Sequence, residues 1–166
     1  MIPRQIRQRA KRALLVILVG ISVSTAYSLS ITIGNGGNWS ITQTSFTMPT
    51  IAGDNLTPTT LTSATNQANL DVKTKRNDPM WTVSVQRTTT SWYSGVHVWA
   101  QRTSTHANVA GGTSYIEVTS TAQTFFYSTA IETSALNTYI QLQLTGLSAF
   151  MGCSNSTTIT YTLTAN

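Results

Sequence analysis

The stretch that decides the fold is Trp81-Thr-Val-Ser-Val-Gln86. Its apolar residues, Trp81, Val83 and Val85, alternate with Thr82, Ser84 and Gln86, which is the two-residue period of a strand with one buried face. The polar run Lys75-Arg76-Asn77-Asp78-Pro79 precedes it and has the composition of a turn. The segment therefore predicts a half-buried β-strand that the chain enters from a turn.

The same alternation recurs along the rest of the chain and predicts eight or nine short strands. The other strands are expected at 29–33, 39–41, 70–72, 96–100, 116–118, 125–127, 140–144 and 157–164. Gly and Asn at 34–38 and the pair Gly111-Gly112 supply turns, because these residues tolerate positive φ. Residues 50–68 are interpreted as a long connection, and no helical period appears after residue 28.

These strands predict an all-β protein with an antiparallel β-sandwich, immunoglobulin-like or jelly-roll-like. The chain contains 31 Thr and 18 Ser, and Thr suits half-exposed strands because it is β-branched. A closed barrel is the alternative architecture. A membrane barrel needs longer strands with apolar outer faces, which these Thr-rich segments do not offer.

Residues 1–28 have the layout of a cleavable secretory signal helix. Five basic residues precede the apolar run that begins at Ala13, and small residues follow it. Cleavage after Ala26 and cleavage after Ser28 are both possible, because each leaves small residues at the −3 and −1 positions. A retained membrane anchor would need about 20 apolar residues, and a pilin-type leader would need a longer helical run. The predicted domains are 1–28 as signal peptide, 29–45 as N-terminal strand and hinge, and 46–166 as β-sandwich.

The positive charge of the chain belongs to the predicted signal. The whole chain has a formal net charge of +5, but residues 29–166 carry five basic and five acidic side chains. A neutral domain does not support binding to nucleic acid, and it lacks the repulsion that keeps copies apart. The single cysteine, Cys153, is expected either to be a free thiol or to pair with another molecule.

The residues that catalysis needs are scarce and scattered. His97 and His106 have no second histidine at ligand spacing, and no G-x-S-x-G or H-E-x-x-H motif occurs. The groups Asp54-Asn55 and Asn66, Asn69, Asp71 do not match a calcium loop and are interpreted as turn residues. The sequence therefore predicts neither an enzyme nor a metal or cofactor site.

One cluster of aromatic residues suggests a binding function. Trp92, Tyr93, His97 and Trp99 are close in sequence, and such rings can form a flat platform on which a sugar stacks. The competing interpretation is packing, because large rings are usually mostly buried. Trp39 and Trp81 are in phase with apolar neighbours and are predicted to lie in the core.

Three triplets match the acceptor motif for N-glycosylation, at Asn38, Asn55 and Asn155. They carry glycan only in an organism that glycosylates exported asparagine. All three fall in predicted turns or loops.

Cleavage after Ser28 makes the alternating strand Leu29-Ser-Ile-Thr-Ile33 the first element of the mature chain. Leu29, Ile31 and Ile33 share one face, and a Gly-rich hinge follows. Such a strand can complete the sheet of a neighbouring copy by strand addition. The alternative is pairing within its own domain, as a hairpin with residues 39–41.

This N-terminal strand, together with the final Thr157-Thr-Ile-Thr-Tyr-Thr-Leu-Thr164, resembles donor-strand-exchange pilins and fimbrial subunits. The last strand is also similar to that of spore-coat subunits and of wall-binding WxL-type domains. The paired cysteines of chaperone–usher pilins and the Trp-x-Leu motif are both missing here. The resemblance implies a head-to-tail homopolymer.

The expected function is therefore a secreted structural subunit of an extracellular filament, assembled through residues 29–33. The alternative is a secreted module that binds the cell wall or carbohydrate through Trp92, Tyr93, His97 and Trp99. The expected partners are other copies of the chain and surface glycans, with no nucleic acid and no membrane span once the signal is removed. The expected location is the extracellular cell surface.

Overall fold

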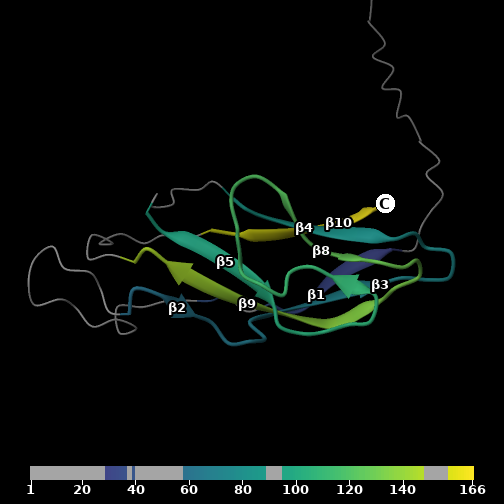
Figure 1. Cartoon of the computed structure of the whole chain (residues 1–166), viewed down its shortest axis with the longest axis horizontal. Helices are drawn as coiled ribbons and strands as arrows, with labels where there is room; N and C mark the ends of the chain where they lie inside the picture. Colours follow the sequence, from purple (N-terminus) through teal and green to yellow (C-terminus); the bar gives the residue numbers. More distant parts are fainter. Residues whose placement is uncertain (1–28, 37–38, 40–57, 89–94, 148–156) are drawn as a thin grey trace, which may run out of the picture.

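The computed structural model describes residues 29–36, 39, 58–88, 95–147 and 157–166. In these residues the chain is all-β, with no helix, and its strands form two antiparallel sheets that pack as a sandwich (Figure 1). The all-β class and the antiparallel sandwich predicted from the sequence are confirmed. The predicted signal segment, 1–28, lies outside the described residues.

The first sheet contains six strands, and five of them follow one another across it. Their order is β1 (Ser30–Gly36), β3 (Ala68–Lys73), β9 (Ala135–Thr145), β5 (His97–Arg102) and β7 (Ile116–Glu117), with β2 (Leu61–Thr62) also paired to β9. The second sheet has four strands in the order β10 (Ile159–Ala165), β4 (Trp81–Arg87), β8 (Gln123–Ser128) and β6 (Val109–Ala110).

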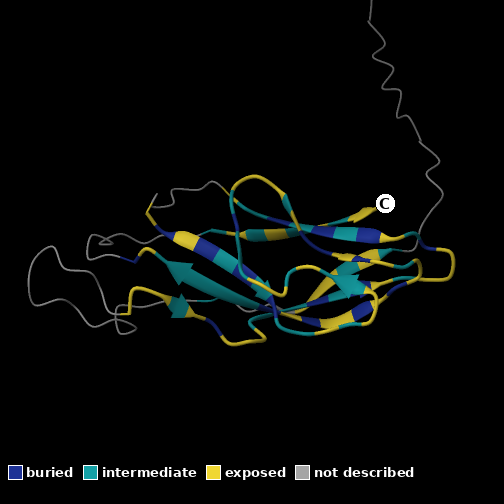
Figure 2. Ribbon diagram, viewed as in Figure 1, coloured by how far each residue is buried: buried dark blue, intermediate teal, exposed yellow. Residues whose placement is uncertain are grey.

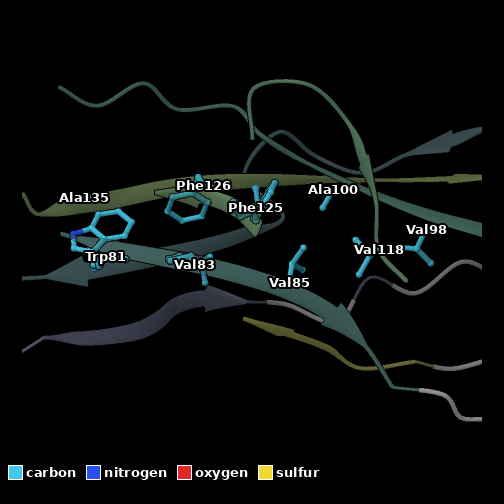
Figure 3. Close-up of a cluster of buried hydrophobic side chains, with 12 residues drawn as sticks. Trp81, Val83, Val85, Val98, Ala100, Val118, Phe125, Phe126 and Ala135 are labelled. Carbon is cyan, nitrogen blue, oxygen red and sulfur yellow. The ribbon is translucent and has the colours of Figure 1, made fainter. Parts of the chain in front are cut away.

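The core lies between the sheets and is centred on β4. Trp81, Val83 and Val85 are fully buried, whereas Thr82 and Ser84 are not, so the strand shows the alternation that its sequence predicts (Figure 2). Figure 3 shows these side chains packed against Phe126 and other apolar residues of both sheets.

Trp81 is bound in the core by its ring and by its nitrogen. Its ring meets Phe126 edge-on, with centroids 5.9 Å apart. Its indole N–H donates a 2.7 Å hydrogen bond to the carbonyl oxygen of Thr133. The one polar atom of this large side chain is therefore satisfied inside the core.

Two details of pairing differ from the sequence predictions. In the described residues β1 pairs with β3, whereas a hairpin with residues 39–41 was the alternative expected; Trp39 is described outside any strand, and residues 40–41 lie outside the described part. The two-residue strands β2 and β6 were not predicted, because a periodic pattern cannot be recognised over two residues.

A bulge in β9 explains the polar group around Asp71. The pairing of β3 with β9 shifts register between Leu70 and Val72, and Asn137 adopts a positive φ of 56°. The backbone N–H of Asn137 donates to Asp71 Oδ1 at 2.7 Å, and Asn69 Nδ2 donates to Asn137 Oδ1 at 3.2 Å. The Asp71 carboxylate therefore satisfies the irregular backbone of the bulge, and Asn69 holds the side chain of Asn137 beside it.

Candidate functional site

The predicted assembly strand forms an edge of the first sheet as β1. In the described residues it pairs only with β3, with Ile31 opposite Val72 and Ile33 opposite Leu70. Paired residues of neighbouring strands point to the same face of a sheet. Because Val72 and Leu70 are fully buried, both isoleucines lie on the core-facing side of β1.

The three apolar residues of this strand differ in burial. Leu29 and Ile31 are half-buried and pack against the core cluster. Ile33, on the same face, has an exposed fraction of 58%. The strand therefore contributes two side chains to the core of its own chain and leaves a third, large apolar side chain open to solvent.

The last strand, β10, forms an edge of the other sheet. It pairs with β4 over seven consecutive residues without a register shift. Its inward residues Ile159, Tyr161 and Leu163 pack against the core. Tyr161 stacks on Phe125 with ring centroids 6.2 Å apart, and burial raises the pKa of its phenol.

β1 and β10 also contact one another, although they belong to different sheets. One side of the sandwich is therefore bounded by two edge strands, one from each layer. An edge strand presents backbone donors and acceptors that can pair with another chain. This side, formed by β1 and β10, is the candidate assembly site.

The second candidate site, the aromatic platform, is only partly described. His97 and Trp99 lie on the outer face of β5, opposite the buried Val98 and Ala100. His97 Nδ1 is 2.7 Å from Glu117 Oε1, and the Trp99 indole N–H donates to Thr145 Oγ1 at 2.9 Å. Trp92 and Tyr93 lie outside the described residues.

Amide side chains surround Trp99 on this outer face, and they too bond within the protein. Gln141 accepts from the Tyr115 hydroxyl at 2.9 Å and donates to the carbonyl oxygen of Ser63 at 3.0 Å. Gln101 donates to the carbonyl oxygen of Thr113 at 2.9 Å. Neither glutamine was predicted as a site residue, although alternation with Leu142 and Ala100 signals that both face outward.

Several other predicted sites fall where the structure gives no description. Asn38, Asn55 and Asn155, the three glycosylation triplets, lie outside the described residues, and so does Cys153. Among the described residues, no three His, Cys, Asp or Glu side chains gather as metal ligands would. The described part also contains no helix long and apolar enough to cross a membrane.

The second histidine has a structural environment that the sequence did not reveal. His106 Nε2 lies 3.2 Å from Ser104 Oγ and 3.1 Å from Thr138 Oγ1, and the ring is half-buried. Burial lowers the pKa of His106, and the nearby charge of Arg102 lowers it further. The folded protein therefore favours neutral His106.

This environment predicts a loss of stability in weak acid. Above the unfolded pKa of about 6.5 the histidine is neutral in both states and has no effect. As the pH falls through that value, the unfolded chain takes up a proton that the folded chain resists, so the free energy of unfolding falls. The loss is complete below the lowered pKa of the folded state. Urea denaturation at about pH 7.5 and pH 5.5 measures it.

The control for this prediction is a pair of histidine variants. His106→Gln should lose less stability between the two pH values than the natural chain. His97→Gln should keep the loss of stability that depends on His106. His97 lies on the outer face of β5, whereas Arg102, which lowers the pKa of His106, faces inward on the same strand. Equal pH dependence in the natural chain and in His106→Gln would rule out this role for His106.

Comparison with protein-family models, with curated proteins and with solved structures gives no match to this chain. The function is therefore inferred from the residues and their geometry.

Proposed function

We propose that this chain is a secreted structural subunit that polymerises at the cell surface by exchanging its N-terminal strand between copies. The observation that carries the proposal is the position of β1. It is an edge strand, its Leu29 and Ile31 complete the core, and β3 is its strand partner in the described residues. A strand of this kind can be supplied by a neighbouring copy with the same register.

The chemistry of the edge suits such an exchange. Leu29–Gly36 contains no charged residue, so no buried charge opposes its transfer from one copy to another. The backbone pairing with β3 provides affinity, and the side chains that enter the core set the register. Both contributions are the same whether the strand comes from the same chain or from another.

The stretch of sequence between β1 and β2, the next described strand, is long enough for β1 to reach a second copy. Residues 37–60 separate the end of β1 from the start of β2. Short connections force a strand to pair locally, whereas a long connection allows a strand to reach a second copy. Head-to-tail exchange does not close on itself, so it generates a filament.

The rival function is a module that binds wall material or carbohydrate through the outer face of β5. There the Trp99 indole N–H is bonded to Thr145, and His97 is paired with Glu117. These polar atoms would have to exchange partners before they could bind a sugar. In strand exchange, by contrast, each contact that β1 breaks with β3 of its own chain is made again with β3 of another copy, and we therefore favour assembly.

A disulfide across the β1–β3 pair tests the exchange. Ser30 and Lys73 are exposed cross-strand neighbours. One chain carries Ser30→Cys and another carries Lys73→Cys, both with Cys153→Ser, and the two are co-expressed. Strand exchange places the new thiols of different chains within disulfide distance. We expect a disulfide-linked species of two chains on a non-reducing gel, and fibres in negative-stain micrographs of the unmodified protein.

The control replaces Lys73→Cys by Lys75→Cys, which lies beyond the end of β3 and has no partner on β1. This pair should remain unlinked. If Ser30→Cys and Lys73→Cys link only when they are placed in the same chain, β1 pairs within its own domain. Fibres that persist after deletion of residues 29–33 would likewise contradict the proposal.

A further inference from the structure

Of the sheet edges in the described structure, β10 is the least protected against pairing. The edge strands β6 and β7 contain two residues each, and β1 has an irregular register between Ile33 and Gly36. β10 contains seven residues in regular pairing and has no charged residue, proline or glycine. Natural sheets usually shield their edges with short strands, bulges, prolines or charges, and β10 has none of these.

The backbone groups on the outward side of β10 can be identified from the bonds at its two ends. The Thr158 carbonyl oxygen accepts from the Thr88 N–H, and the Asn166 N–H donates to the Met80 carbonyl oxygen. Antiparallel strands alternate bonded residues with residues that face away. The even-numbered residues therefore bond to β4, and the odd-numbered ones face away from it: Ile159, Tyr161, Leu163 and Ala165.

No described backbone group bonds to this outward side. It offers N–H and C=O groups at every second residue, which is the spacing that an added antiparallel strand requires. The side chains of the same strand alternate as well, with apolar residues toward the core and threonines toward solvent.

We infer that β10 pairs antiparallel with β10 of a second copy about a two-fold axis at Thr162, which joins two four-stranded sheets into one. The strand is self-complementary about this residue. Thr162 meets its own copy, Thr160 meets Thr164, and Tyr161 meets Leu163. Threonines therefore oppose threonines on the outer face, and apolar side chains oppose apolar ones on the core face.

This register uses the whole strand. The outward residues Tyr161 and Leu163 face one another as hydrogen-bonded pairs, and so do Ile159 and Ala165. All seven residues of each copy are paired, with about eight new backbone hydrogen bonds. An interface in which the same patch occurs on both subunits is the usual basis of a closed dimer.

The exposed Ile33 supports an additional strand at this position. It lies on the core-facing side of β1, yet its exposed fraction is 58%. β1 contacts β10, so a strand added beside β10 also lies on the side of the sandwich that β1 bounds. An exposed apolar side chain on that side is one that an additional strand can cover.

The contact is distinct from the exchange of β1, because it uses the opposite sheet and no residue of 29–36 pairs in it. It joins copies laterally in pairs, whereas exchange of β1 joins them head to tail. A failure of one contact does not imply a failure of the other.

Cysteines on the outer face of β10 test the axis in the purified chain. In a Cys153→Ser background, Thr162→Cys places two thiols opposite each other in a non-hydrogen-bonded pair, with Cα atoms about 4.5 Å apart. We expect mild oxidation to give a disulfide-linked dimer. Thr160→Cys is the matched control, because it lies on the same face but four residues from its own copy in this register. Its yield should be at least about tenfold lower, since its Cα distance exceeds disulfide range.

A charge exchange at the same residue tests the pairing without oxidation. The Thr162→Lys chain alone and the Thr162→Glu chain alone should both be monomers, because like charges meet at the axis. Light scattering measures this on samples that contain no β1-dependent fibres. An equimolar mixture should recover the dimer. Equal yields of cross-linked dimer for the Thr160→Cys and Thr162→Cys chains would overturn the inference. An unmodified chain that does not pair through β10 and stays a monomer by light scattering would overturn it too.

Discussion

Replacement of Trp81 by alanine is expected to remove a large share of the free energy of unfolding of this protein. The side chain is fully buried, packs edge-on against Phe126, and donates its N–H to the Thr133 carbonyl oxygen. Removing a large aromatic side chain from a core costs about 3–5 kcal/mol. A domain of this size is typically stable by about 5–15 kcal/mol. The loss therefore removes a large share of the stability, which urea denaturation followed by circular dichroism measures.

Trp99→Ala is the matched control, because Trp99 lies on the outer face of β5 and is half-buried. Its loss should cost about 1 kcal/mol, which is the typical worth of its hydrogen bond to Thr145. Trp81→Phe should fall between the two variants, since it keeps an aromatic ring but leaves the Thr133 carbonyl oxygen without its donor. Equal losses for Trp81→Ala and Trp99→Ala would show that the core is not centred on β4.

Arg102→Met is expected to be the next most destabilising change. Arg102 has an exposed fraction of 3%, and it faces inward on β5 in phase with Val98 and Ala100. Its guanidinium donates twice to the Gly111 carbonyl oxygen, at 2.9 and 3.1 Å, and once to that of Ser104. It also lies over the Phe126 ring, 5.9 Å from the centroid.

The guanidinium thus replaces water for two carbonyl groups, that of Ser104 in the loop between β5 and β6 and that of Gly111 directly after β6. Burial lowers the pKa of Arg102, but arginine remains charged in proteins. Methionine fills a similar volume and donates no hydrogen bond, so two acceptors lose their partner. Each such group costs about 1–3 kcal/mol. We expect a loss of stability of about 3 kcal/mol by urea denaturation, and faster cleavage of residues 103–112 by a protease.

Two further variants test whether this loss of stability comes from the hydrogen bonds of Arg102. Arg102→Lys should recover only part of the stability, because one ammonium group lacks the planar fork that reaches both carbonyls. Arg76→Met, at an exposed residue of the turn before β4, should change stability by less than about 0.5 kcal/mol. If Arg102→Met were as mild as Arg76→Met, the loop would be held by other contacts.

Local pattern was enough to locate most of the strands. β4 and β10 lie where alternation placed them, because inward and outward side chains alternate along each strand. β8 lies where its aromatic run placed it, but its neighbouring Phe125 and Phe126 are both buried, at a shift in its register with β4. β9 is longer than predicted, since it continues through Asn137, whose positive φ forms a bulge. The bulge depends on Asp71, 66 residues earlier in the chain, and no local pattern contains that information.

The positions of the candidate site residues were also predictable only in part. His97 lies on the exposed face that its alternation with Val96 and Val98 predicts. The inward direction of Arg102 follows the same alternation, but its partners come from a loop that returns to β5. For the N-terminal strand, the sequence indicated an extended apolar segment and left its partner open. The structure pairs it with β3 and leaves Ile33 exposed.

The sequence by itself determined that the part of 29–166 that the structure describes forms short strands, that Trp81 lies in the core, and that residues 29–166 carry no net charge. Only the tertiary structure decided which strands become edges, that β1 and β10 bound the same side of the sandwich, and that the buried Arg102 lies near enough to the half-buried His106 to lower its pKa. The reason is physical: alternation records which side of a strand is buried, a local property. Pairing depends on backbone groups, which are the same at every residue, and so it is decided only when distant strands meet.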